Sequence, residues 1–228
     1  MNDVIVARGL HKYYESGDQT LKILVGLDLD VAAGDTVAVV GESGAGKTTL
    51  LNLLGGLDKP TAGRVLVEGT EIFKMKDGPR ARFRNRRVGY VFQFHHLLPE
   101  FNALENVIIP LLIARMETGE AERRARTYLA AVGVRDRESH RPAKLSGGER
   151  QRVAVARALA AEPAVILADE PSGNLDERTA ESLHDLLFEL NASLGQTFVI
   201  VTHNRALAGR CSRTLTLEGG TLREDAAR

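Results

Sequence analysis

The chain has 228 residues, of which 43% are hydrophobic and 26% charged, and these proportions exclude a chain that is disordered throughout. Thirty basic and thirty acidic side chains give a formal net charge of zero, so we expect no nucleic acid as a partner and no direct contact with an anionic membrane. The single cysteine, Cys211, cannot form an internal disulfide, and the first ten residues lack the apolar run of a secretion signal, so we expect a reducing cytoplasm.

Strands and helices are predicted to alternate along the chain. Several apolar runs contain no polar residue, as expected of strands that helices cover on both faces. The predicted strands are residues 4–7, 36–40, 65–67, 88–92, 164–168 and 198–201, and the predicted helices are residues 49–57, 120–132, 149–161 and 179–194. This order predicts an α/β fold whose mixed sheet has a parallel core.

The segment from about residue 97 to residue 145 has helical signals and no convincing strand. We therefore expect a helical subdomain here, inserted into a core formed by residues 1–96 and 146–228. The length of the chain corresponds to one sizeable hydrophobic core, so residues 1–228 are predicted to form a single domain.

Residues 41–48 read GESGAGKT and lie between an apolar run and a helical run. This order is that of a phosphate-binding P-loop, in which backbone N–H groups and the helix dipole hold an anion. The alternative is a glycine-rich turn with a surface lysine, but the bare sequence pattern should arise by chance in only about one chain of this length in a hundred. Lys47 is predicted to reach the β- and γ-phosphates, and the Thr48 hydroxyl to bind Mg²⁺. The predicted nucleotide-binding residues of this loop are Gly41, Glu42, Ser43, Gly44, Ala45, Gly46, Lys47, Thr48 and Thr49.

A second element, AVILADEP at residues 164–171, ends an apolar run with two carboxylates. Unpaired charges at the edge of a sheet are costly unless a cation or solvent satisfies them. Because neighbouring side chains leave a strand in different directions, Asp169 is predicted to bind Mg²⁺, while Glu170 faces a water in line with the γ-phosphate. A solvated turn is the alternative, but the preceding P-loop favours a catalytic role for Glu170.

Residues 145–151 read LSGGERQ, which resembles the signature motif of ATP-binding-cassette (ABC) ATPases. Other motifs of that family follow over nearly the whole chain: Gln93 after VGYVF, the two carboxylates, GNLD at residues 173–176, and His203 after FVIVT. The resemblance implies a P-loop nucleotide-binding domain that includes an antiparallel β region. It also implies an Mg-dependent ATPase coupled to transport, with ATP and Mg²⁺ as its ligands.

The resemblance further implies a head-to-tail dimer, in which the signature of one copy closes over the P-loop of a second copy. The residues alone support a second anion-binding helix start, although an ordinary capped helix would read the same way. Asp176 would act across the dimer interface. The signature residues implied to contact nucleotide are Ser146, Gly147, Gly148 and Glu149.

Three more residues gain a role only through the resemblance. Gln93 would touch Mg²⁺ and the attacking water, and His203 would sense the γ-phosphate. Taken alone, a surface glutamine and a packed histidine are the simpler interpretations. Tyr14 would stack on adenine, but Tyr13 adjoins it, so the choice between them stays open, and a core tyrosine is an alternative.

The run QFHHLLPEFNALENV at residues 93–107 indicates a partner. In exporters of this family the segment after the glutamine docks the membrane subunit, so integral membrane subunits are expected near residues 94–110. The chain would then be peripheral, on the cytoplasmic face of the inner membrane. The run resembles that of ATPases that power lipoprotein release from the cytoplasmic membrane toward the outer membrane. ATPases of macrolide-exporter and cell-division complexes are the alternatives, and a soluble ABC ATPase is a weaker one because this sequence has no coiled-coil insertion or second cassette.

Two further features are expected to have no catalytic role. His95 and His96 lack the cysteine or carboxylate cluster of a metal site, so docking or packing is predicted for them. Arg80, Arg84 and Arg87 share one helical face. For these arginines a solvated face is favoured over contact with anionic headgroups or a partner loop.

Overall fold

The computed structural model of the protein describes residues 3–17 and 19–224 and contains two sheets. The larger sheet has the strand order β10 (Thr221–Glu224), β9 (Arg213–Glu218), β3 (Thr36–Val40), β8 (Thr197–Val201), β7 (Val165–Asp169) and β6 (Val88–Val91). The smaller sheet has the order β2 (Gln19–Ala32), β1 (Asp3–Ser16), β4 (Ala62–Val67) and β5 (Thr70–Glu71). The helices are α1 (Lys47–Leu54), α2 (Asp77–Arg87), α3 (Ala103–Ile113), α4 (Thr118–Ala131), α5 (Gly147–Leu159), α6 (Glu177–Leu194) and α7 (Arg205–Ala208).

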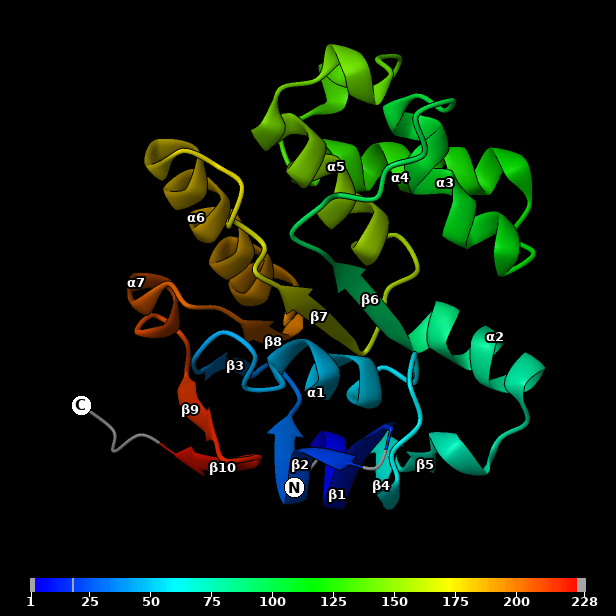
Figure 1. Cartoon of the computed structure of the whole chain (residues 1–228). Helices are drawn as coiled ribbons and strands as arrows, with labels where there is room; N and C mark the ends of the chain where they lie inside the picture. The colour runs from blue at the N-terminus through cyan, green and yellow to red at the C-terminus, as the bar shows by residue number, and fades with distance from the viewer. Residues whose placement is uncertain (1–2, 18, 225–228) are drawn as a thin grey trace.

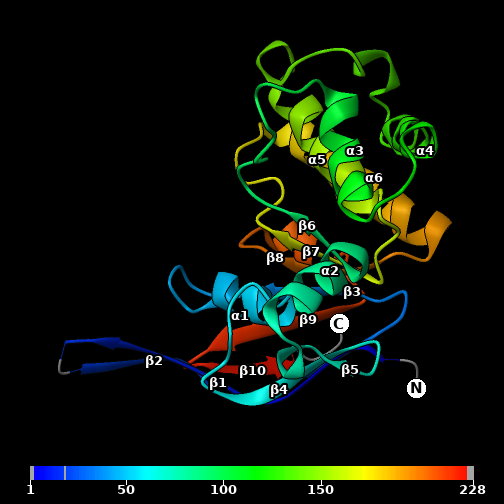
Figure 2. The same ribbon diagram turned by 90° about the vertical axis from the view of Figure 1, so that its right-hand side faces the viewer.

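These elements are arranged in layers (Figure 1 and Figure 2). Helix α1 lies between the two sheets and contacts β7, β8 and β4. Helices α3 to α6 lie beyond the opposite face of the larger sheet (Figure 2). No helix within the described ranges is long and apolar enough to cross a membrane.

The strand pairings confirm the predicted fold class. In the larger sheet, β9, β3, β8, β7 and β6 pair in parallel and β10 pairs antiparallel to β9. The pairings of the smaller sheet are antiparallel. The mixed sheet with a parallel core and the antiparallel β region are therefore both present.

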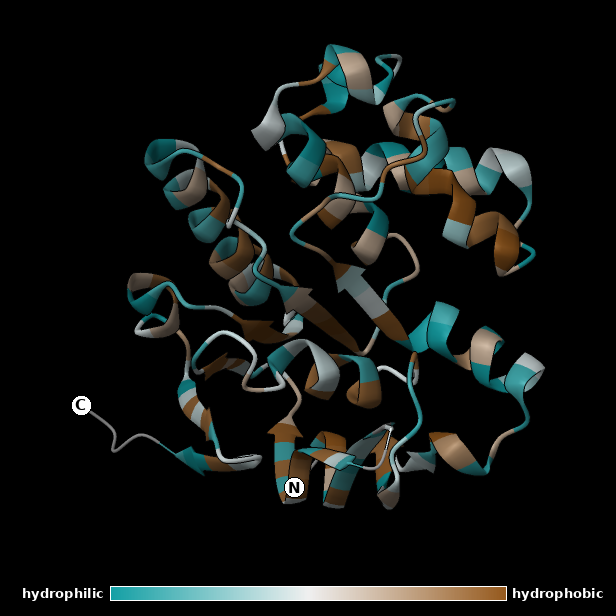
Figure 3. Ribbon diagram, viewed as in Figure 1, coloured by the Kyte–Doolittle hydropathy of each residue, from teal (hydrophilic) through white to brown (hydrophobic). Residues whose placement is uncertain are grey.

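The central strands are apolar throughout because each of their faces is covered. On β7, Val165 and Leu167 pack into the core around α1, whereas Ile166 and Ala168 pack into the core under α5 and α6. The hydrophobic colour accordingly runs along β7 and β8 (Figure 3). Their carboxyl ends meet at one edge of the sheet, which is where an α/β fold places its ligand.

Several predicted boundaries are wrong, and side-chain capping explains the starts of α4, α5 and α6. The predicted helices at 49, 120, 149 and 179 each begin two residues too late. Asp176 shows the reason: its side chain accepts a hydrogen bond from the Thr179 N–H at 3.0 Å, so α6 begins directly after it.

The first predicted strand, residues 4–7, ends too early, and the predicted strands do not include β2, β5, β9 and β10. β1 continues to Ser16 and pairs with β2 in a long hairpin whose register includes Tyr14 opposite Leu21. The far end of this hairpin is exposed, so cross-strand pairing stabilises it without a buried apolar face. Hydrophobic periodicity does not report such a strand.

The segment between residues 97 and 145, which is fully described, contains α3, α4 and two short 3₁₀ turns and no strand. Asn102 caps α3 and forms a capping box with Glu105. Asn106, fully buried, fixes the loop before the helix: its amide donates to the carbonyl oxygens of Leu98 and Phe101, each at 3.1 Å, and accepts from the Leu98 N–H. The division of the domain at residues 97 and 145 stays a prediction.

Candidate active site

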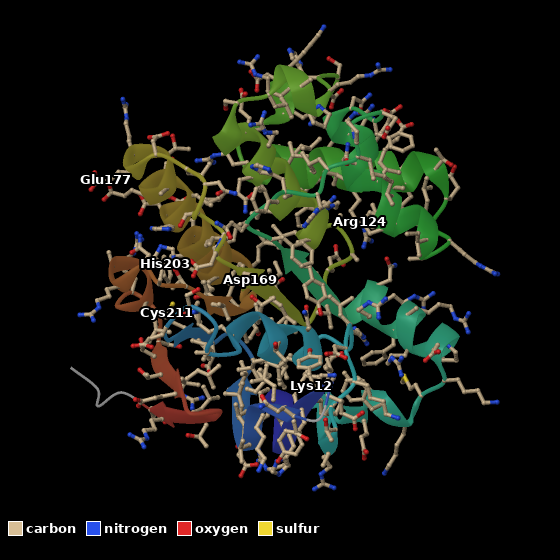
Figure 4. The ribbon with its side chains drawn as sticks, in the orientation of Figure 1. Lys12, Arg124, Asp169, Glu177, His203 and Cys211 are labelled. Carbon is tan, nitrogen blue, oxygen red and sulfur yellow. The ribbon has the colours of Figure 1, made fainter. Side chains whose placement is uncertain are left out.

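A cavity of about 460 Å³ opens at the carboxyl ends of β3 and β7. It brings together residues that lie up to 180 positions apart in the chain, from Ile23 to His203. The lining residues are Ile23, Gly41, Ser43, Gly44, Gly46, Lys47, Thr48, Thr49, Gln93, Asp169, Glu170 and His203. The structure thus places both carboxylates, the glutamine, the histidine and the predicted P-loop residues other than Glu42 and Ala45 around one space. Figure 4 shows Asp169 near the centre of the molecule, with His203 to its left in that view.

The P-loop owes its shape to glycine at the start of α1. Gly46 has a φ of 99° and is the N-cap residue of that helix. A Cβ atom at this position would lie 2.6 Å from Cγ2 of Ile23, so a side chain here would both strain the backbone and collide with β2. The Lys47 ammonium bends back over the loop and donates to the carbonyl oxygens of Gly41 at 2.8 Å and Glu42 at 2.9 Å. Hydrogen bonds within the chain therefore hold the lysine against its own loop.

Thr48 and Asp169 join the P-loop to β7. The Thr48 hydroxyl donates to Oδ2 of Asp169 at 2.8 Å. Burial raises the pKa of Asp169, and the charge of Glu170 raises it further. A half-buried carboxylate and a hydroxyl provide two hard oxygen ligands, and a cation bound to them would neutralise the negative charge. These two residues fit Mg²⁺, which prefers such ligands and would favour the ionised carboxylate.

Glu170 is held in an unusual conformation immediately after β7. Its φ is 45°, in the left-handed region that residues with a side chain rarely adopt. Its N–H donates to the Val201 carbonyl oxygen at 2.9 Å, which ties the turn to β8. One carboxylate oxygen accepts from the Thr202 hydroxyl at 3.3 Å, and the other lies 2.9 Å from Nδ1 of His203. Backbone strain of this kind is concentrated at functional sites.

Gln93 follows β6 and lies beside the turn that follows Glu170. Its amide nitrogen donates to Oδ1 of Asn174 at 3.3 Å, and the Asn174 amide donates to the Gln93 carbonyl oxygen at 3.0 Å. A Cβ atom on Gly173 would lie 2.9 Å from the Gln93 amide nitrogen, so a larger residue here would displace the Gln93 side chain. The side chain thus lines the cavity while its amide contacts the GNLD turn.

The signature motif begins α5 and does not line this cavity. The Ser146 side chain accepts from the Glu149 N–H at 3.2 Å, and the Glu149 carboxylate accepts from the Ser146 N–H at 2.7 Å. Arg137 also donates to Glu149 at 2.7 Å. These bonds, led by the one from Arg137, lower the pKa of Glu149 to about 2. Glu149 therefore fixes the first turn of α5. Its predicted part in nucleotide binding would be indirect, because it holds the Ser146 backbone in place.

Residues 24–173 of the chain match the family model described as ABC transporter. The chain belongs to the ABC transporter family. This membership makes the chain an ABC ATPase, whose domain binds nucleotide, and it confirms the predicted family.

Curated relatives and solved structures cover almost the whole length of this ABC ATPase. The lipoprotein-releasing system ATP-binding protein LolD of Alcanivorax borkumensis is 53% identical over 220 residues, which are 96% of each chain. LolD of Bacteroides thetaiotaomicron is 53% identical over 97% of this chain and 100% of its own length. Among solved structures, the dimeric ATP-binding cassette MJ0796 in a post-hydrolysis state with ADP and Pi is 37% identical, with a TM-score of 0.89 over 98% of this chain and 99% of that chain. A second dimeric structure of MJ0796 has a TM-score of 0.90 at 38% identity.

The two candidate tyrosines of this ABC ATPase lie on opposite faces of the β1–β2 hairpin. Tyr14 pairs with Leu21, and its hydroxyl donates to Oδ2 of Asp58, which lies just beyond α1, at 2.9 Å. Tyr13 projects to the other face, where its hydroxyl lies 2.7 Å from Nδ1 of His11. Tyr14 is 42% exposed and does not itself line the cavity. Its role as the base-stacking residue stays a prediction, but the geometry favours it over Tyr13.

The arginine face of α2 is engaged within the chain. Arg80 pairs with Asp77 at 2.7 Å, and Arg87 pairs with Glu68 at 3.1 Å. Arg84 donates to the Gly56 carbonyl oxygen at 3.0 Å. This face is therefore neither purely solvated nor a free basic surface, because each of the three arginines bonds to the chain itself.

Sequence reasoning missed three residues that shape the site. Ile23 belongs to β2, which was not predicted, and it supports Gly46. The Thr202 hydroxyl bonds to Glu170, but in the sequence Thr202 is only a threonine at the end of a strand, before His203. Asn174 lies in the GNLD turn and bonds to Gln93, which lies 81 residues earlier in the chain. Only the adjacency of Thr202 to His203 could have drawn attention to it.

Proposed function

We propose that this ABC ATPase powers the release of lipoproteins from the cytoplasmic membrane toward the outer membrane. The observation that carries the proposal is its 53% identity, over nearly the whole chain, to proteins named lipoprotein-releasing system ATP-binding protein. The similarity extends well beyond the few residues that line the nucleotide cavity. It therefore supports a shared partner and cargo as well as shared chemistry.

The hydrolysis step follows from the donors and acceptors of the cavity. The N–H groups of the P-loop and the Lys47 ammonium bind the β- and γ-phosphates. Thr202 and His203 hold the Glu170 carboxylate in position, and Glu170 takes the proton of the attacking water. Mg²⁺, held by Thr48 and Asp169 with Gln93 nearby, would supply positive charge that offsets the charge of the phosphates.

A second copy of the chain would complete each site. The signature serine begins a helix and carries a hydroxyl, as an anion-binding helix start requires, yet it does not line the cavity of its own chain. The two MJ0796 structures that match this fold are both dimeric. We therefore place Ser146, Gly148 and Asp176 of one copy against the P-loop of the other.

A membrane subunit would dock on the segment that follows Gln93. Phe94 is 65% exposed, Leu98 is 42% exposed and Phe101 is 41% exposed, so this segment presents apolar side chains to solvent. Surfaces of this kind mark protein interfaces. The ATPase would thus lie on the cytoplasmic face of the membrane through its partner, and the lipid chains of the cargo would never contact it.

Depletion of the protein in its own bacterium tests the role. Lipoproteins with an outer-membrane destination should accumulate in the inner membrane, as measured by membrane fractionation. Exchange of residues 94–101 should block their release in complemented cells while the purified variant keeps its basal ATPase activity. Residues 192–194, which are exposed at the end of α6, are exchanged in the same way as the control. Normal lipoprotein sorting with impaired drug efflux or septation would move the assignment to the macrolide-exporter or cell-division type.

A further inference from the structure

A cluster of three side chains lies beside the nucleotide cavity, and none of them lines it. Asp58 accepts from the Tyr14 hydroxyl at 2.9 Å and from the Lys12 ammonium at 2.8 Å, one on each carboxylate oxygen. The Lys12 ammonium also lies 4.7 Å from the centre of the Tyr14 ring. Lys12 is only 9% exposed, and Figure 4 shows it beneath α1 among the strands of the smaller sheet.

The cluster connects the end of the P-loop helix with the strand that carries the tyrosine. Asp58 lies just beyond α1, where its N–H donates to the Asn52 carbonyl oxygen at 3.2 Å. Lys12 makes a further bond to the carbonyl oxygen of Lys59 at 2.9 Å. A single carboxylate therefore holds Tyr14 in a fixed relation to the helix whose first turn forms the phosphate site.

The two faces of the Tyr14 ring are not equivalent. The Lys12 ammonium lies over one face, as in a cation–π contact, and is itself fixed by Asp58. Tyr14 is nevertheless 42% exposed, so the residue keeps accessible surface although the Lys12 ammonium lies over one ring face. The Thr49 hydroxyl, which belongs to the cavity lining, is close enough to influence the pKa of Tyr14. The ring thus lies next to the phosphate site.

We infer that Asp58, together with Lys12, is a positioning residue that orients the Tyr14 ring so that the face away from Lys12 stacks on the base of the bound nucleotide. The inference rests on the proposed nucleotide site. A tyrosine on an exposed hairpin end would otherwise sample several rotamers, and ordering it on binding would weaken affinity. Asp58 reduces this entropic cost because the bond to the Tyr14 hydroxyl and the contact with the Lys12 ammonium hold the ring before the nucleotide binds.

Isothermal titration of ADP with Mg²⁺ tests the inference without interference from hydrolysis. Tyr14→Ala should weaken ADP binding by roughly ten- to hundredfold, as expected for loss of base stacking. Asp58→Ala should weaken it by about three- to tenfold, as expected for loss of one positioning contact. In the Tyr14→Ala background, Asp58→Ala should change the affinity less than about twofold, since a positioning residue has nothing left to orient.

Three controls separate positioning from a structural role. Asp58→Asn keeps an acceptor for the hydroxyl and should recover part of the lost affinity, and it replaces Asp58→Ala if that variant does not fold. Asp77→Ala breaks an exposed ion pair on α2 and should leave ADP affinity unchanged. Equal losses from Asp58→Ala with and without Tyr14, or none at all, would overturn the inference. Lys47→Ala must weaken ADP binding; if it does not, the proposed nucleotide site fails and the inference fails with it.

Discussion

Nδ1 of His203 lies 2.9 Å from Oε1 of Glu170, and the two residues come from the ends of adjacent parallel strands. The carboxylate of a general base can only accept, so a catalytic Glu170 requires the tautomer of His203 that carries its hydrogen on Nδ1. His203 has 73% of its side chain exposed, whereas Glu170 has 16%. The neighbouring carboxylate, Asp169, bonds instead to Thr48. Two adjacent acids therefore have separate partners, one on the P-loop side and one on the β8 side.

Glu170→Gln should lower the rate of ATP hydrolysis by about 10²- to 10⁴-fold, because glutamine keeps the shape of the side chain but cannot accept the proton. ATP binding should persist, since the P-loop is unchanged. Steady-state phosphate release and equilibrium nucleotide binding measure the two effects. Glu177→Gln, an exposed change at the start of α6, is the control and should hydrolyse ATP normally. Turnover of Glu170→Gln within a fewfold of the unmodified protein would remove Glu170 from the role of base.

ATP should convert the Glu170→Gln variant from monomer to dimer, because the signature lies outside the cavity of its own chain and slow hydrolysis would leave the nucleotide in place. Size-exclusion chromatography with light scattering measures the mass with and without ATP. The double variant Lys47→Ala with Glu170→Gln should stay monomeric. A monomer at all protein and ATP concentrations would argue against sites shared between two copies.

The sequence predicted which residues meet around the cavity better than it predicted the bounds of the strands and helices. The residues of the P-loop and Asp169–Glu170 occur in short contiguous motifs, so their chemistry could be read without any knowledge of distant contacts. β2 was missed because its distal half is exposed and its stability comes from pairing with β1. The support that Ile23 gives to Gly46 was missed with it, since that contact joins two separate segments.

Long-range hydrogen bonds were the other source of error. The arginines of α2 were read from their spacing as a solvated face, yet Arg84 bonds to Gly56 and Arg87 pairs with Glu68. Helical periodicity shows which residues share a face but not which loop that face meets. The same limit applies to the choice between Tyr13 and Tyr14, which depended on the strand register.

Glu149→Gln should destabilise the protein in a pH-dependent way. The bonds from Arg137 and from the Ser146 N–H lower the pKa of Glu149 to about 2, below its ordinary value near 4.5. A lowered pKa means that the ionised carboxylate stabilises the fold above about pH 4.5 and that this contribution disappears as the pH falls toward 2. At about pH 7 the variant should lose about 1 kcal/mol of unfolding free energy, the usual size of a helix-capping effect.

Urea unfolding at about pH 7, 5 and 3.5 measures this difference, which should shrink at the lowest pH. Glu181→Gln, an exposed change within α6, supplies the control and should show no such trend. A constant difference between Glu149→Gln and the unmodified protein across these pH values would contradict the assignment of the capping box as charge-dependent.

Arg157→Ala should loosen the docking segment from the signature helix. The Arg157 guanidinium, on α5, donates to the carbonyl oxygens of His95 and His96, each at 2.7 Å, and burial lowers its pKa. Loss of these charged hydrogen bonds leaves two carbonyl groups without their donor, so the unfolding free energy should fall by about 2 kcal/mol in urea titrations. Arg82→Ala, on the exposed side of α2, should change it by less than about 0.5 kcal/mol. Equal stabilities of the two variants would show that Arg157 does not hold this segment. The expected difference in stability would instead show that Arg157 fastens residues 95–96 to α5, the helix that begins with the signature.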